Sequence, residues 1–198
     1  MKKTLPANAA LIPANAKPVF KGQIFDVWQW PQEMFDGSTE TFEMLRRPDT
    51  VQVIVVRDQQ ILLVEDEQPG RSVRLHFPGG RVDDKDDSWL AAAQRELLEE
   101  TGLSCADWRL IDVQQPAIKI EWFTPIFLAQ NVTSEVAAQV DVAGEKIKPV
   151  WQDFTAVRER VLAGDEPTMV YLLPFFNHVE SLAALVNHPE MTGETVDR

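Results

Sequence analysis

Three glutamates stand close together in residues 95–102, which read Arg-Glu-Leu-Leu-Glu-Glu-Thr-Gly. An α-helix advances about 100° per residue, so Glu96, Glu99 and Glu100 fall on one side of the helix that this segment predicts. Carboxylates that share one face repel one another, and a hard divalent cation relieves that repulsion. Magnesium prefers oxygen ligands and is usually held by a few carboxylates together with substrate phosphates. The segment therefore predicts a magnesium site, with manganese as the alternative ion, for chemistry on a phosphate ester or anhydride.

The flanking residues favour a helix with defined ends. Asp86 or Asp87 can cap its start, a run of alanines follows, and Gly102 stands where a left-handed C-cap is expected. Arg95 and Glu99 are four residues apart and can pair, which would hold one carboxylate in place.

A pair of glycines, Gly79 and Gly80, precedes this helix. Glycine lets the backbone turn tightly and approach a ligand closely. The alternative interpretation is a solvated charged face on an ordinary amphipathic helix. We favour the metal site because an arginine, the glutamates and a glycine all keep a fixed spacing directly after a glycine turn.

Composition places these residues in a globular protein. The 198 residues suffice for one full core. A net charge of -12 disfavours nucleic-acid binding, which relies on basic patches, but a bound metal still permits phosphate substrates. Cys105 is the only cysteine, so no intrachain disulfide can form and a reducing, cytoplasmic location is expected. No segment approaches the apolar length of a membrane helix, so no membrane partner is expected.

Three regions are predicted along the chain. Residues 1–17 repeat Pro-Ala-Asn-Ala and are expected to form a flexible arm. Residues 18–48 are rich in aromatic and β-branched residues around a turn at 35–38, which predicts an antiparallel β-hairpin. Residues 49–198 alternate strands with helices and predict a mixed sheet with a helix on each face.

Within the third region, Pro125 predicts an edge strand or a bulge, and Pro174 predicts an interruption of the last helix. Strands are expected at residues 51–56, 61–64, 75–77, 108–113, 117–129 and 147–151. Helices are expected from the cap at Asp86 or Asp87 to the C-cap at Gly102, and at 154–163 and 170–186.

At the glycine turn and helix the sequence resembles the Nudix box, whose pattern is Gly, five residues, Glu, seven residues, then Arg-Glu-apolar-x-Glu-Glu-x-Gly-apolar. Residues 95–103 match every specified position of the second half. Two features depart from the pattern. Asp87 stands where the family has Glu, and six residues rather than five separate it from Gly80. The resemblance implies an α/β fold, the Nudix-type α/β/α sandwich with a mixed β-sheet, here with an N-terminal antiparallel β-hairpin extension.

The chain is most similar to the ADP-ribose pyrophosphatase branch of that family, because of its N-terminal hairpin and the strand that ends at Glu65. This resemblance implies a homodimer formed through the N-terminal sheet. It also implies magnesium-dependent hydrolysis of ADP-ribose to AMP and ribose 5-phosphate. Catalytic Glu99 and Glu100 would hold the metal ions together with Glu96 and the backbone carbonyl of Gly80.

Further roles follow from position relative to the box. Glu43 with Arg46 or Arg47 is placed to reach adenine or phosphate, and Arg71 and Arg74, in the loop before the box, are placed to meet substrate phosphates. For each of these residues an exposed surface charge is the alternative.

In related enzymes a loop after the main sheet often supplies the general base. Here Glu145 is the preferred candidate, with Glu135 and Asp141 behind it. Histidines at positions 76, 178 and 188 lack zinc-ligand spacing and are interpreted as structural. Two alternatives to ADP-ribose hydrolysis stay open. One is a Nudix hydrolase of another nucleotide, such as a nucleoside triphosphate, another nucleotide sugar or a capped RNA. The other is a nucleotide-sensing module that does not hydrolyse.

Overall fold

The computed structural model describes the whole chain apart from residues 68–69, 71, 137–145, 165 and 198. Its centre is a six-stranded sheet with the order β11, β6, β5, β10, β8, and β7 also pairs with β6. Only the pairing between β5 and β10 is parallel, so the sheet is mixed, as predicted. The strands span β5 Gln52–Arg57, β6 Gln60–Glu67, β7 Arg74–His76, β8 Leu103–Gln114, β10 Thr124–Glu135 and β11 Lys146–Asp153.

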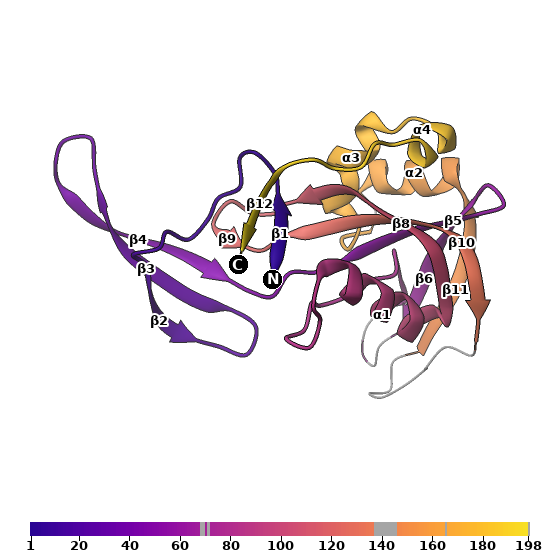
Figure 1. Cartoon of the computed structure of the whole chain (residues 1–198), viewed down its shortest axis with the longest axis horizontal. Coiled ribbons are helices and arrows are strands. Elements are labelled where there is room, and N and C mark those ends of the chain that lie inside the picture. The colour runs from indigo at the N-terminus through magenta and orange to yellow at the C-terminus, as the bar shows by residue number, and fades with distance from the viewer. Residues whose placement is uncertain (68–69, 71, 137–145, 165, 198) are drawn as a thin grey trace.

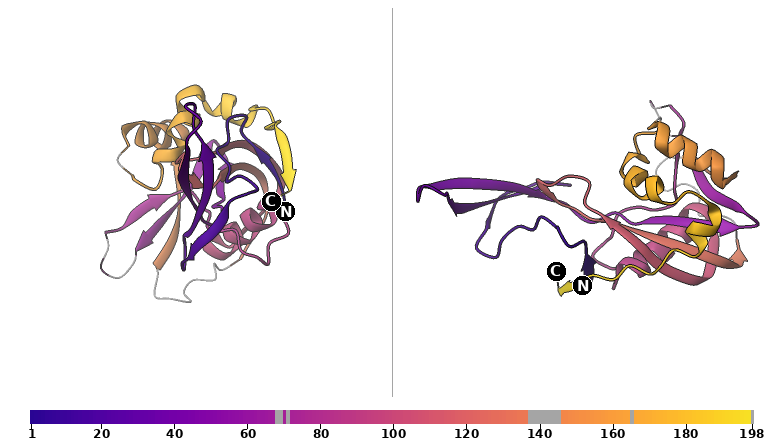
Figure 2. Two further views of the ribbon diagram at one scale, coloured as in Figure 1. Left: turned by 90° about the vertical axis from the view of Figure 1, so that its left-hand side faces the viewer. Right: turned by 90° about the horizontal axis from the view of Figure 1, so that it is seen from above.

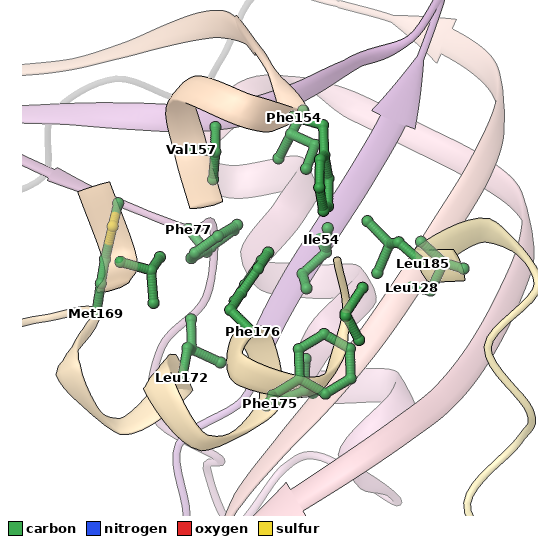
Figure 3. Close-up of a cluster of buried hydrophobic side chains, with 14 of the residues drawn as sticks. Ile54, Phe77, Leu128, Phe154, Val157, Met169, Leu172, Phe175, Phe176 and Leu185 are labelled. Atoms are coloured by element: carbon green, nitrogen blue, oxygen red, sulfur yellow. The ribbon is translucent and has the colours of Figure 1, made fainter. Parts of the chain in front are cut away.

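Helices cover both faces of this sheet (Figure 1). One face carries α1, Trp89–Thr101, whose buried Leu97 packs in one cluster with Val51 and Val53. The opposite face carries α2 and three short helical segments, which pack around Ile54 and the stacked rings of Phe77 and Phe176 (Figure 3). These elements span α2 Phe154–Ala163, η1 Val170–Leu172, α3 Leu173–His178 and α4 Leu182–Val186. The predicted α/β/α sandwich is confirmed.

Alternation along β5 separates the two layers. Val51 and Val53 belong to the α1 side, whereas Ile54 belongs to the α2 side. Because side chains of a strand point alternately to the two faces, Gln52 lies on the α2 side of the sheet. Gln52 is a polar residue in an otherwise apolar run.

Pro174 and Pro125 lie at irregularities of the last helix and of strand β10. The helix expected at 170–186 is broken into η1, α3 and α4, and Pro174 lies in the first turn of α3, where its missing amide costs no helical hydrogen bond. Pro125 lies in β10, which is a central strand, and the register against β8 shifts between Ile126 and Phe127. The expectation of a bulge is therefore confirmed and that of an edge strand is wrong.

The start of α1 differs from the prediction. Ser88, not Asp86 or Asp87, is the N-cap, and its hydroxyl accepts a hydrogen bond from the backbone amide of Ala91 at 3.0 Å. At the other end Gly102 has φ 71°, the left-handed C-cap that was expected. Capping by Ser88 leaves Asp86 available for a different contact.

The N-terminal region forms a second, four-stranded sheet that projects from the sandwich (Figures 1 and 2). Strands β3 and β4 are antiparallel, as predicted for the hairpin, and the turn between them closes with the amide of Gly37 donating to the carbonyl of Met34 at 3.0 Å. The sheet consists of β2 Lys17–Lys21, β3 Asp26–Glu33, β4 Thr39–Arg46 and β9 Ile120–Glu121. Several of its apolar side chains are exposed, including Phe20 and Ile24.

The N-terminal arm is more structured than its composition suggests. Strand β1, Lys2–Leu5, pairs antiparallel with β12, Glu194–Asp197, near the other end of the chain. Leu5 packs against the α1 side of the core, and Ile12 is buried beside the N-terminal sheet. The expected flexible arm is thus replaced by packed backbone, because the C-terminal strand supplies hydrogen-bonding partners that local sequence cannot reveal. Among the helices that the structure describes, none is long and apolar enough to cross a bilayer.

Candidate active site

Arg95 on α1 is the centre of the candidate site. Its Nη1 donates to Glu96 Oε1 at 2.8 Å and to Glu99 Oε2 at 3.0 Å. Its Nη2 also donates to the carbonyl oxygen of Arg81 at 2.9 Å. The predicted pair of Arg95 with Glu99 is therefore present, and the same guanidinium holds a second glutamate. The hydrogen bonds to Asp86, together with those to Glu96 and Glu99, raise the pKa of Arg95 above its ordinary value, although burial works in the opposite direction.

Asp86 clamps the other side of this guanidinium. Its two carboxylate oxygens accept hydrogen bonds from Arg95 Nε at 3.0 Å and Nη2 at 2.8 Å, a bidentate geometry that is strong and specific. The Arg95 contact lowers the pKa of Asp86 below its usual value. Asp87, which stands at the glutamate position of the Nudix pattern, is exposed. The longer loop thus presents Asp86 to Arg95 in place of Asp87.

Glu96 lies directly against Gly80. A Cβ atom added to Gly80 would come within 2.6 Å of the carboxyl carbon and of both oxygens of Glu96. Burial raises the pKa of Glu96, although the hydrogen bond from Arg95 works in the opposite direction. Glycine at this position is therefore required for the carboxylate to approach the turn. The carbonyl of Gly80 accepts the amide of Val51 at 2.9 Å, and a carbonyl oxygen retains a second lone pair.

Gly79 connects the turn to Glu100. Its amide donates to Glu100 Oε2 at 2.9 Å, and its φ of 151° is one that residues with a side chain rarely adopt. An added Cβ would also lie 2.1 Å from the carbonyl oxygen of Val51. The turn runs beside the start of β5, where Val53 donates to the carbonyl of Pro78 at 2.8 Å. The three glutamates of α1 are thus each held, by Arg95 or by the turn, at the same end of the sheet.

These residues fit a divalent cation by their chemistry. All three offer carboxylate oxygens, the ligand type that magnesium prefers, and the raised pKa of Glu96 shows a buried carboxyl whose anion a cation would stabilise. Over the part of the chain that the structure describes, no three acidic, histidine or cysteine side chains already converge on one point. Arg95 and the amide of Gly79 draw the carboxylates toward different partners. Glu96, Glu99 and Glu100 are the residues that would hold the ion.

The N-terminal sheet brings its charged residues to a cavity of about 740 Å³ that also borders the loop before α1. Arg46 and Arg47 both line this cavity. Arg46 forms an ion pair with Glu121 at 2.7 Å, and the Arg47 guanidinium lies 4.4 Å from the ring centroid of Trp122. Glu43 lies elsewhere, paired with Gln29 on the exposed surface of the hairpin at 2.7 Å. The structure therefore places Arg46 and Arg47, but not Glu43, at this cavity.

Arg74 lies on β7 and lines a second, smaller cavity together with His76. Arg71, Asp141 and Glu145 fall outside the described residues. Glu135 is described, and its carboxylate is 65% exposed and accepts from Arg57 at 3.1 Å. Of the other two histidines, His188 packs its ring 5.2 Å from that of Phe175, a structural contact.

Sequence reasoning missed Asp49, a buried carboxylate at the entrance to β5. It accepts hydrogen bonds from the indole of Trp89 and the amide of Phe123, both at 2.9 Å, and pairs with Lys3 at 2.8 Å. Asp49 thereby ties α1, the start of β10 and the N-terminal strand to one point. The sequence shows it only as part of a turn signal, so no local pattern indicated this role.

A model of the NUDIX domain matches residues 46–174, so the chain belongs to the Nudix family. The 8-oxo-dGDP phosphatase NUDT18 of Danio rerio is 29% identical over 101 residues, which cover 51% of this chain but only 30% of that protein. The methanol dehydrogenase activator of Bacillus methanolicus is 27% identical over 132 residues, covering 64% of this chain and 70% of its own.

Solved structures share the fold. A structure described as an ADP compounds hydrolase matches with a TM-score of 0.60 and 20% identity, over 83% of this chain and 92% of that one. A NUDIX hydrolase from Nitrosomonas europaea matches with a TM-score of 0.53 and 22% identity, over 68% of this chain and 90% of its own. At these identities the likeness concerns the fold alone.

Proposed function

We propose that this chain hydrolyses the pyrophosphate bond of a nucleoside diphosphate linked to another moiety, and that ADP-ribose, split into AMP and ribose 5-phosphate, is its substrate. The observation that carries the proposal is the arrangement of Glu96 and Glu99 on the Arg95 guanidinium, facing the turn at Gly79 and Gly80. Water adds to one phosphorus, the bridging P–O bond breaks, and each product keeps one phosphate. Membership of the Nudix family and the fold shared with an ADP compounds hydrolase support this choice.

The residues have separate tasks in this reaction. Glu96, Glu99 and Glu100, with the carbonyl of Gly80, hold magnesium, or manganese in its place. The metal, when bound, neutralises phosphate oxygens and makes a water molecule more acidic. Arg95 orients two of these carboxylates.

Substrate contacts come from two regions. Arg46 and Arg47, which line the larger cavity, contact the nucleotide, and Arg71 and Arg74 contact the phosphates from the segment before the turn. Each is tested by the Michaelis constant of its alanine variant, which rises for a residue that binds substrate.

Hydrolysis is tested by AMP release from ADP-ribose in magnesium. Glu99→Gln and Glu100→Gln each lower kcat by about a hundredfold or more, because each removes an anionic ligand while keeping side-chain size. Full activity in either variant, with the protein folded, rules out the proposed site. Glu145 is the proposed general base, and Glu145→Gln lowers kcat, whereas Glu135→Gln, the matched change on an exposed and already paired carboxylate, leaves it unchanged.

We further propose a homodimer formed through the N-terminal sheet, in a cytoplasmic setting that the lone Cys105 favours. The exposed aromatic and aliphatic side chains of that sheet support this, because a projecting apolar surface is an interaction site in most proteins. Light scattering on Phe20→Asp detects a monomer if the sheet forms the interface. Val136→Asp, a comparably exposed position outside that sheet, keeps the dimer. A monomeric wild-type protein contradicts the proposal.

A second candidate function is hydrolysis of another nucleotide, favoured by the similarity to a relative named for action on 8-oxo-dGDP. A panel containing ADP-ribose, other nucleotide sugars, nucleoside di- and triphosphates and a capped RNA separates the candidates by kcat/KM. Tight nucleotide binding in magnesium without turnover of any of them would instead indicate a sensing module.

A further inference from the structure

A cavity of about 210 Å³ lies beside the core sheet. It opens where β5, β6 and β7 meet the segment around η1. Every residue that lines it carries a hydrogen-bonding side chain: Gln52, Asp66, Ser72, Arg74, His76, Thr168 and Tyr171. So many hydrogen-bonding side chains around one small cavity require an explanation, because ligand pockets usually have only a few polar groups among apolar and aromatic side chains.

Gln52 is the first sign that the cavity is built for a ligand. Its side chain is only 4% exposed, and its Oε1 has no hydrogen-bond partner among the groups that the structure describes. Thr124, fully buried on the neighbouring strand, has an unpartnered Oγ1 as well. Gln52 stands opposite Ile126, so Thr124 is its diagonal neighbour on the same face. Buried polar atoms without partners are costly, and pairing with a ligand hydroxyl removes that cost.

Arg74 and Tyr171 supply the complementary donors. Within the described residues no carboxylate forms an ion pair with Arg74, although Asp66 is its cross-strand partner between β6 and β7. The Arg74 guanidinium therefore remains available to an anion. Burial raises the pKa of Tyr171 to about 12, so its hydroxyl keeps its proton at neutral pH. The pocket thus combines a cation, a phenol donor and a buried amide acceptor.

The cavity lies close to the candidate metal site. Strand β7 ends at His76, and Gly79, whose amide contacts Glu100, follows three residues later. Three residues of extended chain span at most about 10 Å. A phosphoanhydride lying over the glycine turn therefore has one of its substituents within reach of the cavity.

We propose that this cavity binds the phosphorylated pentose of the substrate, with Arg74 on its phosphate and Gln52 on a ribose hydroxyl. This inference rests on the proposed hydrolysis of ADP-ribose. It identifies where the ribose 5-phosphate half of that substrate binds. The size agrees, since a cavity of 210 Å³ is below the range of about 300–1,000 Å³ for drug-sized ligands. A pentose phosphate offers the hydroxyls and the anion that Gln52 and Arg74 are able to bind.

The test is calorimetric binding of ribose 5-phosphate and, separately, of AMP to the full chain in EDTA. Gln52→Leu weakens ribose 5-phosphate binding by about tenfold and Arg74→Ala by about thirtyfold, in line with a neutral and a charge-assisted hydrogen bond. AMP binding does not change in either variant. Gln130→Leu and Arg57→Ala, the same substitutions at positions outside the cavity, leave both ligands unaffected.

Thermal unfolding shows whether a variant with weakened binding is still folded. Gln52→Leu replaces an unpartnered buried amide by an apolar group of similar size, so its Tm equals or exceeds that of the wild type. Loss of AMP binding in these variants, with ribose 5-phosphate unaffected, overturns the proposal and assigns the cavity to the nucleoside half. Absence of any effect on either ligand also overturns it and leaves an ordered water as the occupant. A wild type that binds ribose 5-phosphate through Gln52 but never cleaves ADP-ribose refutes the proposed function and not this inference.

Discussion

Replacement of Asp86 by asparagine tests the clamp on which the acidic cluster depends. The side chain of Asp86 is 5% exposed and that of Arg95 is 17% exposed. Two hydrogen bonds, of 2.8 and 3.0 Å, join the carboxylate to the guanidinium. Removing one partner of a buried ion pair costs about 3–5 kcal/mol when the remaining charge is left alone. Here Arg95 keeps Glu96 and Glu99, and asparagine keeps an acceptor oxygen. We therefore expect a loss of about 2 kcal/mol in the free energy of unfolding.

That loss corresponds to a fall in Tm of about 4–8 °C for a chain of this length. Activity falls too, because a guanidinium no longer fixed by Asp86 holds Glu96 and Glu99 less firmly. We expect kcat for ADP-ribose to decrease about tenfold and the magnesium concentration for half-maximal activity to rise. Calorimetric unfolding and a magnesium titration of initial rates measure these effects at a temperature where both proteins are folded.

Asp87→Asn is the matched control. It makes the same chemical change one residue later, at an exposed side chain, where substitutions usually shift stability by less than about 0.5 kcal/mol. If Asp87→Asn impairs stability and magnesium dependence while Asp86→Asn does not, the loop aligns with the Nudix pattern after all and the reasoning from the Arg95 contacts is refuted.

Three further predictions concern the same region. Gly80→Ala keeps the fold, because the added Cβ clashes only with the movable end of the Glu96 side chain. The displaced carboxylate lowers kcat by about tenfold or more, and full activity with an unchanged Tm would contradict this. Ser88→Ala removes the N-cap bond to the amide of Ala91, so urea unfolding should show a loss of about 1 kcal/mol with little change in kcat. Burial raises the pKa of Cys105 to about 11, so iodoacetamide labels the folded protein slowly at pH 8 and faster as the pH approaches 11. Labelling of the folded protein at pH 8 that is as fast as labelling in urea would refute the raised pKa. Because the folded thiol resists ionisation, its contribution to stability is complete below the ordinary pKa of 9.0 and declines as pH rises above it.

Much of the site was accessible from local pattern, because the residues concerned lie on one helix and its leading turn. The spacing of Glu96, Glu99 and Glu100 follows from helical geometry alone, and the pair of Arg95 with Glu99 follows from the four-residue separation. The cap was misassigned, since serine and aspartate are comparably good N-caps and only the path of the loop selects between them.

Contacts between distant segments were not accessible in the same way. Gln52 and Tyr171 are 119 positions apart in the chain, and nothing in the neighbourhood of either indicates a shared cavity. The pairing of β1 with β12 joins the two ends of the chain, so the Pro-Ala-Asn-Ala repeat gave a misleading impression of a free arm. Arg46 forms its ion pair with Glu121 of β9, a partner 75 positions away that the sequence around Arg46 does not indicate.

The sequence by itself determined the periodic features: an acidic helix after a glycine turn, alternating strands, and the composition of a globular protein with one cysteine. Such features depend on bonds within a few residues, where backbone geometry alone sets the direction of each side chain. The tertiary structure decided which aspartate reaches Arg95, which arginines are already paired, and which polar residues are left unpartnered around a cavity. Those outcomes depend on packing between segments far apart in the chain, and no local spacing encodes the path that brings them together.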